Sequence, residues 1–340
     1  MSSLAATQGQ SVALRLRGFI LPAILIAVAA AVPSFSNSYF VEIGILLLMF
    51  AYLGTSWDIL GGWTGQMSFG HAAFFGLGAY ASSLLWINAG LSPWFGMVAG
   101  ALVASAFGVV VALATFRARL RGHYFALAMF AIAQMLMALF VNLKQVGGIT
   151  IGGSEGLQLP YTGANPAAMV FDSREPFYYL LLAMVVIVVG TVKLISLSRF
   201  GAYLQAVCND EDAAEALGVD VFRCKVAAMA ISAFFTGAMG AVYGQIYLYI
   251  EPGIVFSPAY SIQGLLCAVI GGSGTVWGPL LGALVLTPLA EVSKIFFRDL
   301  SGLDLMIYGA ALIIFVRFIP QGLMGLLSSW LRRLRKEGAA

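Results

Sequence analysis

Charged residues are scarce in this chain of 340 residues, where only 10% of positions carry a charge. Hydrophobic residues make up 61% of the sequence, whereas a soluble domain is roughly 45 to 50% apolar. The formal net charge is only +3, and we expect no nucleic-acid partner. This composition excludes an ordinary soluble domain and indicates an integral membrane protein embedded in the lipid bilayer.

Cysteine and histidine are scarcer still, with three and two residues. Cys208, Cys224 and Cys267 show neither metal-ligand spacing nor the pattern of a disulfide framework. His71 and His123 are too few and too scattered for a zinc site, which argues against a membrane metalloprotease. We therefore expect no bound metal.

The G-x-x-x-x-G-K-[ST] loop that cradles nucleotide phosphates is missing as well. No nucleophile, base and orienting group stand together in a recognisable motif. We expect no catalytic residues and no cofactor in this chain. Any process that needs energy would have to draw it from another chain or from an ion gradient.

Long apolar runs are what the sequence has in abundance. Runs of about 20 residues recur along nearly the whole chain, as membrane-spanning helices require, and LLAMVVIVVG (181–190) lacks the alternation of a β-barrel strand. We predict an all-α polytopic membrane protein in which residues 1–340 form a single transmembrane domain. Ten spans are expected, at about 18–33, 39–60, 65–87, 93–115, 122–143, 177–195, 225–249, 259–272, 277–296 and 303–318.

Two of these spans need comment. The first follows Arg15 and Arg17 and is interpreted as a membrane helix rather than a removable signal peptide, because the chain after it does not become soluble. The span at about 259–272 is short and ends in GGSGT, which is typical of a broken or re-entrant element. Eight spans are therefore an alternative to ten.

Basic residues are unevenly distributed between the predicted loops. With ten spans and a cytoplasmic N-terminus, fourteen of the eighteen basic residues fall on the inner side, as the positive-inside rule expects. Both termini are then cytoplasmic. Two loops exceed hairpin length, an outer loop at about 144–176 and an inner loop at about 196–224.

The inner loop concentrates acidic residues, because NDEDAAEALGVDVFRCK (209–225) holds five of the fifteen in the chain. Asp212 and Glu215 have the spacing of a capping box, and Gly218 can end a helix in the left-handed conformation. This predicts a cytoplasmic helix of about two turns, the alternative being a solvated connecting loop. Its small residues favour the close approach of another backbone: Ala213, Ala214 and Ala216.

This segment resembles a known family. SRFGAYLQAVCNDEDAAEALGVDVFRCKVAAM (198–229) is similar to the cytoplasmic loop of ATP-binding-cassette importer permeases of the branched-chain amino acid class. Further matches follow in consistent order and cover about residues 40–326: GGWTGQMSFGHAAFFGLGAY (61–80), RGHYFALAMFAIAQML (121–136), VGGITIGGSEGL (146–157), SIQGLLCAVIGGSGTVWGPLLGALVL (261–286) and FIPQGLMGL (318–326).

The resemblance implies a type II importer permease in the inner membrane of a bacterium. Its partners would be a second homologous permease subunit, two cytoplasmic ATPase subunits that use ATP, and an extracytoplasmic substrate-binding protein. The small-molecule solute would be a branched-chain or related amino acid, with urea, short amides and aromatic acids as alternatives. The residues expected to couple to the ATPase are Asn209, Asp210, Glu211, Ala213, Ala214, Glu215, Ala216 and Gly218.

Polar residues inside the spans are candidates for the solute path. Gln66, Ser68 and His71 cluster with Gly65 and Gly70, where the backbone is accessible, and we predict that these five line the path. Hydrogen bonding between helices is the alternative.

Several glycine pairs separated by three residues are predicted to let helices pack backbone to backbone in lipid. These pairs are Gly61/Gly65, Gly96/Gly100, Gly240/Gly244 and Gly278/Gly282.

An ion-coupled secondary transporter or passive channel acting alone is the alternative from a different class. Such a protein needs paired intramembrane carboxylates or basic residues. The sequence offers few, since Asp58, Glu291 and Asp304 lie near predicted span ends. An importer permease driven by separate ATPase subunits is therefore favoured.

Overall fold

The structure is a computed structural model that describes residues 26–34, 37–161 and 163–296. Beyond residue 296 it describes single positions and short stretches between 306 and 329. The predicted span at about 303–318 lies almost entirely outside the described residues. Of the predicted first span, only residues from 26 onward are described, as helix.

Eight segments in the described part are long and apolar enough to cross a membrane. The prediction of a polytopic helical protein is confirmed, and the count of ten stays a prediction. The spans are α2 (Ser38–Thr64), α3 (His71–Ala89), α4 (Pro93–Arg117), α5 (Gly122–Asn142), α6 (Glu175–Leu197), α9 (Val221–Tyr247), the pair α10 (Pro252–Val255) and α11 (Pro258–Gly271), and α12 (Gly278–Phe296).

Apart from β4, the remaining elements lie in two connections. Between α6 and α9 are the helices α7 (Arg199–Asn209) and α8 (Glu211–Ala216). Between α5 and α6 are β1 (Gln145–Val146), β2 (Ile149–Thr150), η1 (Gly153–Glu155), β3 (Leu157–Gln158) and η2 (Pro166–Ala168). β1 and β2 form an antiparallel hairpin, and β3 pairs antiparallel with β4 (Tyr249–Ile250), which follows α9.

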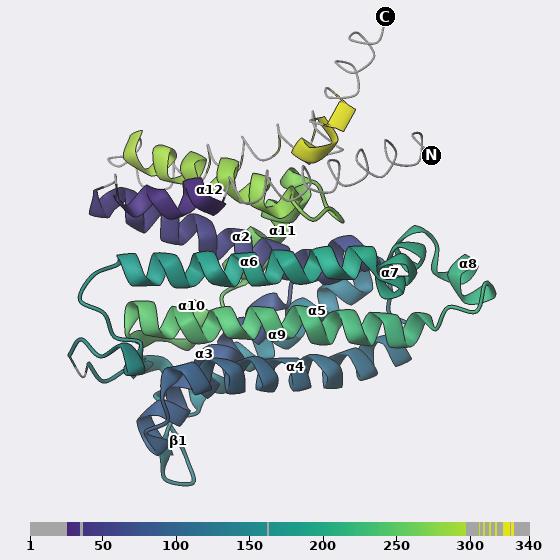
Figure 1. Cartoon of the computed structure of the whole chain (residues 1–340). Helices are drawn as coiled ribbons and strands as arrows, with labels where there is room; N and C mark the ends of the chain where they lie inside the picture. The colour runs from purple at the N-terminus through teal and green to yellow at the C-terminus, as the bar shows by residue number, and fades with distance from the viewer. Residues whose placement is uncertain are drawn as a thin grey trace, which may run out of the picture.

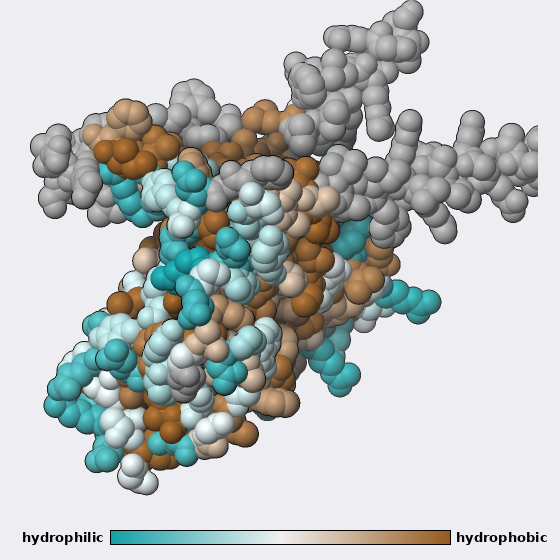
Figure 2. Space-filling model, turned by 60° about the vertical axis from the view of Figure 1, so that its left-hand side comes forward, coloured by the Kyte–Doolittle hydropathy of each residue, from teal (hydrophilic) through white to brown (hydrophobic). Residues whose placement is uncertain are grey.

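The long helices lie side by side, with the two connections at opposite ends of the bundle (Figure 1). α7 and α8 stand at one end, and α8 projects beyond the spans. The β1–β2 hairpin stands at the other end. Figure 2 turns this second end toward the viewer and shows hydrophilic residues gathered over it, with hydrophobic residues along the flank. This distribution suits a bundle whose flank contacts lipid and whose ends contact water.

Ion pairs of charged residues lie at both ends of the bundle, the α7–α8 end and the hairpin end. Arg121 and Lys225 form ion pairs with α8 at one end. Lys144 pairs with Glu155, and Arg174 pairs with Glu42, at the other end. The predicted separation of inner from outer basic residues therefore matches two opposite ends of the bundle.

The predicted span at about 65–87 begins later than expected, at His71. Gly65 has φ +72° and ends α2, and only glycine adopts this left-handed conformation without steric cost. Residues 65–70 therefore form a turn at the α7–α8 end of the bundle. We call this segment the 65–70 turn.

Small residues bring α3, α4 and α9 together. A Cβ atom added to Gly100 of α4 would lie 2.6 Å from the carbonyl oxygen of Gly78 in α3. Gly237 of α9 lies against Ala104 of α4, and Gly240 lies against the backbone of Phe75. Backbones in such contact gain van der Waals energy, which is what holds helices together in lipid. The prediction is confirmed for Gly96/Gly100 and for Gly240, whereas Gly65 serves as a helix cap.

The short span predicted at about 259–272 corresponds to α11, and the chain is interrupted before this helix rather than at GGSGT. α10 ends at Val255, and α11 begins at Pro258 after the N-cap Ser257, whose hydroxyl accepts a hydrogen bond from the amide of Ala259 (3.3 Å). Proline has no backbone N–H, so it fits the first position of a helix and interrupts a continuous one. Neighbouring elements bury the break, since Val255 and Phe256 are buried.

We predict that Gly100→Val lowers the stability of the purified protein, because the added methyl groups have no space between α3 and α4. Overpacking of this kind costs about 1–3 kcal/mol. The measurement is the midpoint of thermal unfolding in detergent. Gly190→Val in α6 is the matched control, because nothing lies within 4 Å of a Cβ atom there. An equal midpoint for the two variants would contradict the close packing.

Candidate functional site

The α8 helix begins at a clear N-cap. Asp210 has extended backbone angles (φ −161°, ψ 114°), and its Oδ1 accepts hydrogen bonds from the amides of Asp212 (2.9 Å) and Ala213 (3.0 Å). The prediction that Asp212 is the capping residue is therefore wrong. Asp212 already lies in the first helical turn, where its backbone is helical and its carboxylate faces Arg121 instead.

The end of α8 matches the prediction for Gly218. This residue has φ +86°, its amide donates to the carbonyl of Glu215 (3.0 Å), and the amide of Val219 donates to the carbonyl of Ala214 (3.0 Å). This pair of bonds is a Schellman motif, which satisfies two carbonyls at the helix end. A helix of six residues is thus closed at both ends by its own sequence.

The predicted coupling residues divide between two faces of α8. Ala214 is buried against the bundle, and the Glu211 side chain is only 14% exposed. The others are exposed to solvent: Asn209, Asp210, Ala213, Glu215, Ala216 and Gly218. Leu217, which the sequence analysis did not select, is 85% exposed. Its side chain therefore lies on the solvent-facing side of α8, together with the exposed alanines.

Arg121 connects α8 to the turn between α4 and α5. Its guanidinium contacts both carboxylate oxygens of Asp212, at 3.0 and 3.4 Å, and its Nε lies 2.9 Å from Glu211. Hydrogen bonding and charge attraction from Arg121 lower the pKa of the Asp212 carboxyl. Asp212 is therefore ionised at neutral pH, and the acidic turn of α8 is held to a neighbouring connection.

The 65–70 turn holds the other predicted residues. Gln66 is buried, and its Nε2 donates to Glu211 of α8 (2.8 Å). The indole Nε1 of Trp57 donates to the backbone oxygen of Ser68 (2.7 Å), and Gly70 lies against the backbone of Met129. Gly65, Gln66, Ser68 and Gly70 thus lie together between α2, α5 and α8.

His71 continues this network into the bundle. Ser232 of α9 donates its hydroxyl proton to the carbonyl of Ser56 (2.7 Å), so Ser232 must accept from Nε2 of His71 (2.8 Å). Nδ1 of His71 is then the acceptor for the hydroxyl of Ser68 (3.2 Å). The imidazole is held in one tautomer between the turn and α9, as the hydrogen-bonding alternative expects.

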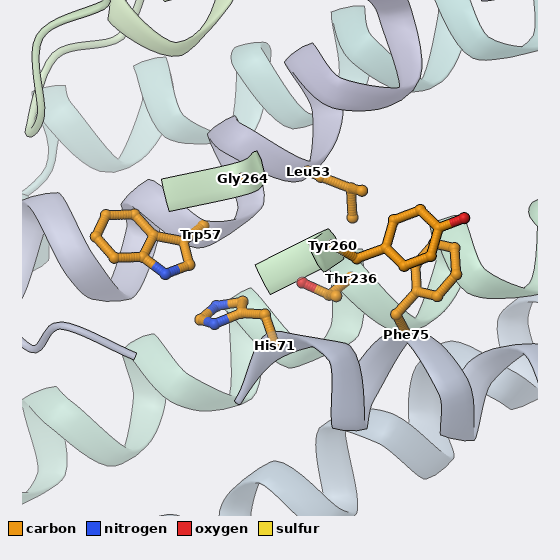
Figure 3. Close-up of a pocket in the computed structure, with 7 residues that line it drawn as sticks. All are labelled: Leu53, Trp57, His71, Phe75, Thr236, Tyr260 and Gly264. Carbon is orange, nitrogen blue, oxygen red and sulfur yellow. The ribbon is translucent and has the colours of Figure 1, made fainter. Parts of the chain in front are cut away.

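A narrow pocket lies at this point between four helices (Figure 3). Trp57 and His71 stand on one side of it, and Tyr260 and Phe75 on the other. Leu53, Thr236 and Gly264 complete the lining. Side chains fill the pocket so closely that no water molecule fits. Of the five predicted path residues, His71 alone lines it.

The intramembrane carboxylates are in different situations. Asp58 is 1% exposed, and both its oxygens accept from the amide of Gly274 (3.0 and 3.1 Å) in the GGSGT turn. Glu291 pairs with Lys294 (2.6 Å), and Asp304 lies outside the described residues. Asp58 thus connects α2 to the α11–α12 turn, a role that its position near a span end did not predict.

No group of three or more histidine, cysteine or acidic side chains in the described residues could hold a metal ion.

Comparison with known proteins identifies the family. The model of the family described as "Branched-chain amino acid transport system / permease component" matches residues 39–316. No solved structure matches the chain.

Individual relatives of the chain are also named as permease proteins of branched-chain amino acid transport. The chain is 27% identical to the high-affinity branched-chain amino acid transport system permease protein LivM of Escherichia coli (strain K12), over 95% of this chain and 81% of that protein. It is 24% identical to the corresponding permease protein LivH of the same organism, over 81% of this chain and 91% of that protein. It is 22% identical to a probable LivM of Methanocaldococcus jannaschii, over 87% of this chain and 86% of that protein. The chain belongs to the family of branched-chain amino acid transport system permease components.

Proposed function

We propose that this chain is the membrane-spanning subunit of an ATP-driven importer for branched-chain or related amino acids. It pairs with a second homologous permease, as suggested by its similarity to both LivM and LivH of one organism. Two cytoplasmic ATPase subunits and an extracytoplasmic binding protein complete the complex in the inner membrane of a bacterium. The binding protein selects the solute.

One observation carries this proposal. α8 projects beyond the spans (Figure 1), at the end where Arg121 and Lys225 lie. Its outer face exposes small residues and Leu217. A transporter acting alone needs no such helix, whereas a subunit powered by another protein needs a surface that receives force. The Schellman end and the Asp210 cap keep α8 helical outside the bundle.

The mechanism follows from this division of work. ATP closes the two ATPase subunits on each other, and the movement displaces α8 in each permease. The spans then alternate between outward and inward access. We place the solute path at the pocket beside His71, where no water molecule fits in the conformation described, so the helices around this pocket must move before the solute passes.

We predict that Gly218→Val weakens the association of the ATPase subunits roughly tenfold. A β-branched residue at φ +86° costs about 1–2 kcal/mol, so the helix end refolds into another conformation. The measurement is co-purification of the ATPase subunits with the permease. Gly90→Val is the matched control, because Gly90 also ends a helix with positive φ (+63°) in open space, at the end of α3.

Glu215→Lys tests the same surface without backbone strain. Glu215 is exposed, and we expect the charge reversal to abolish solute-stimulated ATP hydrolysis by the assembled complex while membrane insertion stays normal. Unchanged hydrolysis in both Glu215→Lys and Gly218→Val would refute the docking role. Proton- or sodium-driven uptake by the purified chain in liposomes, without any ATPase, would favour a secondary transporter instead.

We also predict that α8 faces the cytoplasm. In a Cys208→Ser background, Ala216→Cys should react with a membrane-impermeant maleimide in inverted vesicles and not in intact cells. Gly148→Cys, in the β1–β2 hairpin at the opposite end, should show the reverse pattern. Labelling of Ala216→Cys from outside intact cells would contradict the proposed function.

A further inference from the structure

Glu211 differs from every other acidic residue of α8 in the direction of its side chain. Its side chain is 14% exposed, against 77% for the adjacent Asp212. Three donors converge on it from three elements: Nε of Arg121 (2.9 Å), Nε2 of Gln66 (2.8 Å) and Nζ of Lys225. Glu211 therefore faces the bundle and is not available to an incoming protein.

The three contacts are not easily broken. The Lys225 side chain is 5% exposed, and a buried ammonium separated from its carboxylate is strongly destabilised. Gln66 is buried, and its Oε1 has no hydrogen-bond partner among the described residues. Its bond to Glu211 therefore satisfies an otherwise unpartnered side chain. α8, the start of α9 and the 65–70 turn must move together.

The 65–70 turn also forms hydrogen bonds with two residues that line the pocket, Trp57 and His71. Ser68 accepts from the indole of Trp57 (2.7 Å) and bonds the imidazole of His71 (3.2 Å). Both rings line the same side of the pocket (Figure 3). Gln66 bonds α8, and Ser68, two residues further along the same turn, bonds both rings of the pocket wall, so the turn connects α8 to the pocket.

We propose that Glu211 is a positioning residue that transmits the movement of α8 to the pocket through Gln66 and the 65–70 turn, and that it does not contact the ATPase. The inference rests on the proposed function and assigns different roles to the two faces of α8. The exposed face of α8 binds the ATPase, and the inward carboxylate passes the movement on.

The test measures solute transported per ATP hydrolysed by the full complex in proteoliposomes. Glu211→Gln/Lys225→Met removes both charges, so neither is left buried without a partner, and Gln66→Leu removes the bond to the turn alone. We expect each to lower this ratio about fivefold or more, the size of a typical coupling between sites. Co-purification of the ATPase subunits should stay at the level of the unmodified complex.

The matched control is Glu291→Gln/Lys294→Met, which removes an ion pair from α12 and should leave the ratio unchanged. An unchanged ratio in both Glu211→Gln/Lys225→Met and Gln66→Leu would overturn the proposal. So would a loss of ATPase co-purification as large as that expected for Gly218→Val, because Glu211 would then be a docking contact. Failure of the proposed function has a separate signature, since the unmodified chain would then not retain ATPase subunits at all.

Discussion

A polar group buried away from water is costly unless it finds a hydrogen-bond partner within the protein. Asp58 meets this requirement with the amide of Gly274, His71 with two serine hydroxyls, and Glu211 with three donors. Each of these bonds joins segments that are distant in the sequence or separated by a turn. The interior polar contacts therefore set how the helices and turns are held relative to one another.

The need to pair buried polar groups also explains why α8 and the pocket beside His71 are connected. The 65–70 turn lies at the end of the bundle, where Gly65 reverses the chain, and it contacts α8 on one side and the pocket helices on the other. Glycine contacts between α3, α4 and α9 pack those helices closely. A close-packed interior transmits a displacement rather than absorbing it, which suits the proposed role of a subunit driven by a partner protein.

The site shows where sequence reasoning succeeded and where it failed. Gly218 was recognisable as a helix end because a glycine after a short acidic helix is a strong signal. Asp210 was missed as the cap, since three acidic residues in a row leave the start of the helix ambiguous by one or two positions. Leu217 was missed because its exposure depends on which face of α8 packs against the bundle. The buried Ala214 identifies that face, and its burial is evident only in the folded chain.

By itself, the sequence determined a polytopic helical protein, the positions of the described spans to within a few residues, the separation of basic residues toward two ends of the bundle and the short helix at 211–216. These follow from local patterns, because apolar runs, loop charges and turn glycines act over a few neighbouring residues. Only the tertiary structure decided that Gln66 meets Glu211 across 145 positions and that Trp57, Thr236 and Tyr260 share a pocket with His71. Such contacts depend on how the helices pack and rotate against each other, which no local pattern specifies.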